Sequence, residues 1–175
     1  GESGFELLQA VADARPDASF IIDANEAWRP DQLQDFIDAA GDLRVELIEQ
    51  PLPHDNDAAL EEITSPIPLA ADESFHGLPD LERMAGRYDV INIKLDKIGG
   101  LTEALIAARA AREQGLRLMV GCNGGTSLGI APAYCLSLLC EFVDLDSPLL
   151  LAHDREPGID YRDGRVFPPS AEVWG

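Results

Sequence analysis

Short apolar stretches alternate with amphipathic helical patterns along almost the whole chain, and this alternation restricts the fold more than any other feature. The apolar stretches are rich in Val, Ile and Leu, as buried strands are. Because strand, helix and strand in succession build parallel sheets through right-handed crossovers, we expect an α/β fold. The predicted strands lie at 19–22, 45–48, 68–71, 90–93, 116–121 and 142–143, and the predicted helices at 3–14, 30–40, 57–64, 78–85, 101–114 and 126–140.

Two α/β architectures fit this alternation, a doubly wound sheet and a (β/α) barrel. The glycine fingerprint of dinucleotide-binding sheets is absent after the first predicted strand, which disfavours that version of the doubly wound fold. A complete barrel needs eight strands and about 250 residues, whereas these 175 residues predict six strands. We therefore predict a single domain over residues 1–175, the C-terminal part of a barrel that lacks its first strands. Residues from about 153 to 175 are expected to form loops and a short hairpin.

The charge balance limits the possible partners. Acidic residues outnumber basic ones by 32 to 13, and the formal net charge of −19 disfavours nucleic acids and anionic membranes. The longest mostly apolar run, residues 130–140, is too short to span a bilayer, and no signal-peptide pattern opens the sequence. Three cysteines without a close pairing pattern are typical of reduced thiols, so we expect a cytoplasmic protein.

Three successive predicted strands end in a carboxylate: Asp23, Glu49 and Asp72. In a barrel the carboxyl ends of the strands converge on one mouth, where active sites are built. Carboxylates gathered there would repel one another unless a cation lay among them. Oxygen-only ligands suit Mg²⁺ or Mn²⁺. Zinc is disfavoured because no His or Cys occupies an equivalent position at these strand ends.

The fourth predicted strand ends in Lys94. The chain has only one other lysine, Lys97. Arginine stays protonated near neutral pH, whereas a lysine can release its proton when its surroundings lower its pKa. A lysine in a chain that otherwise uses arginine therefore indicates a titratable amine. The alternative is a solvated lysine at a strand end.

Together these strand ends resemble the enolase superfamily, in its muconate lactonizing enzyme subgroup, which groups with mandelate racemase. The resemblance runs in order from about residue 19 to 165. It is carried by Asp23-Ala24-Asn25, Ile48-Glu49-Gln50-Pro51, Ala71-Asp72-Glu73-Ser74 and Asn92-Ile93-Lys94 with Gly99-Gly100.

The resemblance implies a (β/α)7β barrel with a separate α+β capping domain. It implies one Mg²⁺ held by the three strand-end carboxylates, with Lys94 as a general acid/base next to it. The superfamily is a known case of a lysine or histidine base working with Mg²⁺. Three further residues would orient the ligands or Lys94: Asn25, Glu73 and Lys97.

The pair Asp144 and Asp146 follows the last predicted strand and is similar to the Asp-x-Asp of the dipeptide epimerases, such as L-Ala-D/L-Glu epimerases. There the two acids bind the ammonium group of a dipeptide. The implied reaction is inversion of the α-carbon of the C-terminal residue through an enediolate. The alternative is a pair of exposed acids after a short strand.

Two departures from the family pattern limit this hypothesis. The family takes a second acid/base group from a Lys-x-Lys motif on an earlier strand, and this sequence contains none. The capping domain would also precede Gly1. We therefore expect the chain to be inactive alone and to be completed by an N-terminal segment or chain of the same enzyme, in a homo-oligomer. The alternatives are o-succinylbenzoate synthase, N-acylamino-acid racemase or cycloisomerase activity, or an inactive partial barrel that binds only metal or a partner.

Overall fold

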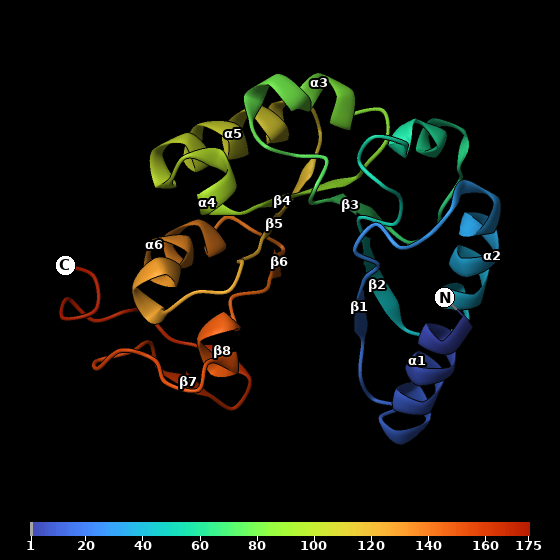
Figure 1. Ribbon diagram of the computed structural model, residues 1–175. Helices are drawn as coiled ribbons and strands as arrows, with labels where there is room; N and C mark the ends of the chain where they lie inside the picture. Colours follow the sequence, from blue (N-terminus) through green and yellow to red (C-terminus); the bar gives the residue numbers. More distant parts are fainter. Residues whose placement is uncertain (1) are drawn as a thin grey trace. The chain divides into compact units, whose positions relative to one another are not determined.

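A computed structural model describes residues 2–175, with side chains from Gly4 onward (Figure 1). The chain forms two compact units. The first comprises the residues up to Phe75 together with 82–90, and the second comprises 76–81 together with 91–175. The single domain expected from the sequence stays a prediction.

The first unit is a three-stranded parallel sheet with helices between its strands. β1 pairs with β2 and β2 with β3, and the register sets Asp23 beside Glu49 and Glu49 beside Ala70. The strand order in this unit therefore follows the chain, as successive right-handed crossovers predict. Its elements are α1 (Glu2–Ala14), β1 (Phe20–Asp23), α2 (Pro30–Gly41), β2 (Val45–Glu49), a 3₁₀ helix (Asp57–Glu62) and β3 (Leu69–Ala71).

Helix α2 begins at Pro30, whose ring suits the first helical turn, and it buries the side chains of Leu33 and Ile37 completely. An aromatic cluster joins this helix to α1. The ring of Phe36 lies 5.0 Å from that of Phe5 and 4.8 Å from that of Trp28, measured between centroids. These contacts pack both helices together on one side of β1.

The second unit continues the same strand–helix alternation. α5 buries four alanines, so the helix can approach its neighbours closely, and β5 pairs with β6 in parallel. Its elements are β4 (Val90–Ile93, which starts at the boundary of the units), α4 (Leu95–Ile98), α5 (Leu101–Glu113), β5 (Arg117–Val120), α6 (Ser127–Ser137), β6 (Phe142–Val143), a 3₁₀ helix (Ser147–Leu150) and the antiparallel hairpin β7 (Tyr161–Arg162) with β8 (Arg165–Val166). Among the helices of the described residues, none combines the length and the apolar character that crossing a bilayer requires.

Two helical segments differ from the sequence prediction. The helix expected at 78–85 is a 3₁₀ turn (Leu78–Asp80) followed by the single-turn α3 (Leu81–Met84). The helix α4, just after Lys94, was not predicted. It is too short to show helical periodicity, and Gly99 ends it with a left-handed φ of 97°. The other predicted helices and strands are confirmed to within a few residues at their ends.

Gly121, which follows β5, has no room for a side chain. A Cβ there would lie 2.6 Å from Nδ2 of Asn92, a side chain that is itself buried. We expect Gly121→Ala to lower the free energy of unfolding by about 1–3 kcal/mol, because the added methyl overpacks the interior. Urea denaturation would measure the loss. The matched control is Gly124→Ala, since nothing lies within 4 Å of a Cβ at that position. Equal stability of the two variants would contradict the prediction.

Candidate functional site

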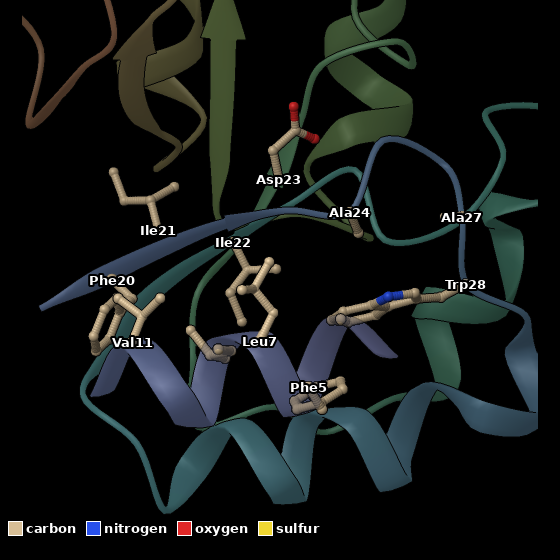
Figure 2. A pocket seen from close by; sticks show the side chains of 12 residues that line it. Phe5, Leu7, Val11, Phe20, Ile21, Ile22, Asp23, Ala24, Ala27 and Trp28 are labelled. Carbon is tan, nitrogen blue, oxygen red and sulfur yellow. The ribbon is translucent and has the colours of Figure 1, made fainter. Parts of the chain in front are cut away.

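The first unit places the three predicted metal ligands at neighbouring strand ends. Asp23 is the last residue of β1, Glu49 the last of β2, and Asp72 the first after β3. Asp23 and Glu49 are register partners, and Glu49 is the partner of Ala70, two residues before Asp72. Because register partners in a sheet project from the same face, the carboxylates of Asp23 and Glu49 leave the sheet on one face, and Asp72 follows directly in the turn after β3. Figure 2 shows Asp23 pointing away from α1, on the opposite side of β1 from Ile22.

These three carboxylates differ in burial and in local partners. Glu49 and Asp72 are each only 3% exposed, whereas Asp23 is exposed. Asn25 folds back on Asp23, donating from its backbone N–H to Oδ1 at 2.8 Å and from Nδ2 to Oδ2 at 3.2 Å. Asn25 has a left-handed φ of 47°, a conformation that asparagine tolerates better than most residues. The contact orients one of the predicted ligands.

Negative charge accumulates around Asp72. Burial raises the pKa of Glu73, and the charges of Asp72, Glu26 and Asp23 raise it further. Oε2 of Glu73 is buried and has no hydrogen-bond partner among the described residues. The negative charges of Asp72, Glu26 and Asp23 therefore lie close enough to Glu73 to disfavour its ionisation, and a cation would relieve that repulsion.

The donor set fits a hard cation, although the side chains are not arranged around one. Within the described part of the chain, no group of three or more His, Cys, Asp or Glu residues is placed to hold a metal ion. The fold nevertheless brings three oxygen-donor residues to adjacent strand ends, and all-oxygen sites are those that Mg²⁺ and Mn²⁺ prefer. Rotation of the side chains would be needed to bring the carboxylates to one point. Their role as ligands stays a prediction.

The predicted acid/base lysine lies in the second unit. Lys94 directly follows β4 with extended backbone angles (φ −109°, ψ 123°), and it is the residue from which α4 starts. Its side chain is half-buried, and Lys97 lies in the last turn of the same short helix. Lys94 therefore lies at the carboxyl end of a strand, as expected, and Lys97 lies in the short helix that follows; their catalytic and orienting roles stay predictions.

The second unit brings Asp144 and Asp146 to a common groove of about 750 Å³, whose other wall is the β7–β8 hairpin. The backbone N–H of Asp144 donates to Val120 O at 2.9 Å, which continues the pairing of β6 with β5. Tyr161 of the hairpin donates its hydroxyl to Leu145 O at 2.6 Å. The alternation of residues 144 to 146 thus exposes both aspartates to one groove, which Arg162 and Arg165 of the hairpin also line.

Sequence reasoning missed the residue that connects the strand ends of the first unit. Gln50 is completely buried, and its side chain bonds to Asp72, Ser74 and Tyr88. The only signal available in the sequence was its place between Glu49 and Pro51. These three partners are 22 to 38 residues away, so no local pattern could have revealed them.

The sequence is similar to curated amino-acid racemases and epimerases. It is 48% identical over 168 residues to an N-acetyl-D-glutamate racemase from a Pseudoalteromonas species, a match that covers 96% of this chain and 53% of that protein. It is 47% identical over 161 residues to the L-Ala-D/L-Glu epimerase of Escherichia coli K12, covering 92% of this chain and 50% of that protein. The chain thus spans about half the length of the curated relatives it matches.

The fold is similar to that of solved enolase-type proteins. A crystal structure of an enolase family member from Agrobacterium tumefaciens, with homology to dipeptide epimerases and with bound sodium and L-Ala-L-Glu, matches with a TM-score of 0.93 and 50% identity. The match covers 96% of this chain and 52% of that one. The family model described as enolase C-terminal domain-like matches residues 2–172. These matches confirm the predicted fold class, and the chain belongs to the enolase C-terminal domain-like family.

Proposed function

We propose that the protein to which this chain belongs is a Mg²⁺-dependent isomerase that inverts the α-carbon of the C-terminal residue of a dipeptide. The observation that carries this proposal is the aspartate pair on one groove, in a chain 47% identical to an L-Ala-D/L-Glu epimerase. The solved relative with bound L-Ala-L-Glu supports the same substrate class.

The predicted site residues would have two roles, binding the metal ion and transferring the α-proton of the substrate. Asp23, Glu49 and Asp72 would hold the cation. When bound, Mg²⁺ supplies positive charge that stabilises the enediolate formed from a carboxylate that has lost its α-proton. The amine of Lys94 would take the α-proton on one face of the substrate and become an ammonium group, which can return a proton to the same face.

Inversion also needs a second acid/base group on the opposite face. The chain has no lysine besides Lys94 and Lys97, so this group would come from another part of the protein. We infer that the same part covers the apolar surface beside β1, the first strand of the sheet. A pocket of about 430 Å³ opens there between α1 and β1 (Figure 2), and the side chains of Leu7 and Ile21 are 67% and 45% exposed. An uncovered edge strand with such a surface favours pairing with a further segment.

Asp144 and Asp146 would select the substrate. Two carboxylates on one groove suit the ammonium group of a free amino terminus, since each can accept charge-assisted hydrogen bonds from it.

A second candidate is racemisation of N-acetyl amino acids, favoured by the 48% identity to the N-acetyl-D-glutamate racemase. An N-acetyl group carries no positive charge. A site built around two carboxylates would therefore give it no ion pair, and the aspartates would contribute nothing to its binding. The two functions thus predict different consequences of removing the acidic pair.

The test replaces each aspartate by asparagine in the full-length protein. We expect Asp144→Asn and Asp146→Asn each to lower kcat/KM for L-Ala-L-Glu by about 10–100-fold, because each removes one charged partner of the ammonium group. Turnover is measured in D₂O as deuterium gained at the α-carbon, by NMR. Asp31→Asn is the matched control, since Asp31 pairs with Arg29 at 3.0 Å and neither residue lines the groove. If the wild type exchanges the α-proton of N-acetylglutamate but of no dipeptide, the epimerase proposal fails.

A further inference from the structure

Gln50 occupies a strained backbone position at the end of β2. Its φ of 34° lies in the left-handed region, which is unfavourable for a glutamine, and its side chain is completely buried. Such a conformation persists only where the surrounding contacts impose it, and it is concentrated at functional sites. The contacts of Gln50 are therefore informative about what this conformation does.

The side-chain oxygen of Gln50 holds the loop that follows β3. Oε1 accepts hydrogen bonds from the backbone N–H of Asp72 at 2.9 Å and of Ser74 at 3.1 Å. The backbone N–H of Gln50 donates to Ala70 O at 2.8 Å. One residue thus bonds both to the end of β3 and to the turn from which the carboxylate of Asp72 projects.

The backbone of the same segment holds the loop that follows β1. The carbonyl of Gln50 accepts from the N–H of Glu26 at 2.9 Å, and that of Glu49 accepts from Ala24 at 3.0 Å. The three strand ends that carry Asp23, Glu49 and Asp72 are consequently linked through residues 49 and 50.

The hydrogen bonds of Nε2 fix the orientation of the Gln50 side-chain amide. Nε2 lies among three acceptors, the carbonyl of Leu52 (2.8 Å), Oγ of Ser74 (2.9 Å) and the hydroxyl of Tyr88 (3.0 Å). A reversed amide would set Nε2 against two N–H donors and Oε1 among these acceptors. The oxygen is therefore held toward Asp72.

We propose that Gln50 is a positioning residue that fixes the backbone segments carrying Glu49 and Asp72 relative to each other, so that both carboxylates can reach one Mg²⁺ ion. The inference rests on the proposed function, because it assumes that these carboxylates are the ligands. Partners that orient metal ligands commonly contribute 10–100-fold to metal affinity.

The test compares two variants of the full-length protein by titration calorimetry with Mg²⁺. Gln50→Met keeps the size of the side chain and removes its hydrogen bonds, and we expect it to raise the Kd for Mg²⁺ by about 10–100-fold. Tyr88→Phe is the matched control. It removes one bond to Nε2 and leaves both bonds to Oε1 in place, so its Kd should stay within about threefold of wild type. In the epimerase assay, Gln50→Met should need more Mg²⁺ for half-maximal activity and recover most of kcat at saturation.

A third variant covers the case in which Gln50→Met does not fold. Gln50→Glu keeps an oxygen acceptor for the N–H groups of Asp72 and Ser74, and we expect it to bind Mg²⁺ more tightly than a Gln50→Leu variant measured beside it. Wild-type affinity in Gln50→Met, or equal weakening in Tyr88→Phe, would overturn the inference. If the wild type binds no Mg²⁺, the inference and the metal part of the proposed function both fail. If it binds Mg²⁺ but exchanges no dipeptide, only the catalytic proposal fails.

Discussion

Replacing Lys94 by methionine in the full-length protein is expected to lower epimerisation of L-Ala-L-Glu by about 10²–10⁴-fold. A positioned general acid/base contributes roughly this much to a proton transfer, and methionine fills the same space without an amine. The measurement is deuterium gain at the α-carbon in D₂O, starting separately from each epimer. Mg²⁺ affinity, measured by calorimetry, should change little, because the three predicted ligands are carboxylates elsewhere in the chain.

Lys94→Arg provides the sharper comparison. It keeps the positive charge next to the substrate, but a guanidinium group does not release its proton near neutral pH. We therefore expect Lys94→Arg to be as inactive as Lys94→Met. If the arginine variant retained more than about a tenth of the wild-type rate, Lys94 would be acting as a fixed charge rather than as a titrating amine.

Replacing Asp57 by alanine is expected to destabilise the protein by about 3–5 kcal/mol. Asp57 is only 1% exposed, and its Oδ1 accepts from Nη1 of Arg87 at 2.5 Å. Its Oδ2 accepts from the hydroxyls of Ser74 at 2.5 Å and Tyr88 at 3.1 Å. The alanine variant would leave these buried donors without their acceptor, although Arg87 would keep its second partner, Glu61, at 2.8 Å.

Urea denaturation of Asp57→Ala and Asp57→Asn measures this effect. The asparagine keeps an acceptor oxygen and should lose less stability than the alanine. Asp31→Asn is the control, since Asp31 pairs with Arg29 on the surface at 3.0 Å, and solvent-exposed pairs contribute little. An Asp57→Ala variant no less stable than Asp31→Asn would show that the buried ion pair carries no net stability.

The architecture could be predicted because the relevant signals are local. An apolar strand and the helix after it are each encoded in neighbouring residues, and parallel crossovers then fix their order. The same reasoning failed at α4, where four residues between Lys94 and Gly99 are too few to show a helical period. It also failed at residues 78–85, where the chain makes a 3₁₀ turn before α3.

The candidate site was predictable only in part. Asp23, Glu49 and Asp72 could be singled out because their positions at the ends of successive strands are visible in the sequence, and the structure places them at the ends of β1, β2 and β3, whereas their role as ligands stays a prediction. Gln50 could not, since its function depends on Ser74 and Tyr88, which only the folded chain brings to it. The roles of Lys94 and of the aspartate pair rest on the family resemblance.

The pocket between α1 and β1 has a practical meaning for purification. Leu7, Val11 and Ile21 expose apolar side chains beside the edge strand β1, and the contact of these side chains with water is unfavourable. When this chain is produced alone, its molecules should associate through that edge and form aggregates of different sizes. If a further segment covers this edge, as the proposed function infers, its production together with the chain should suppress that association.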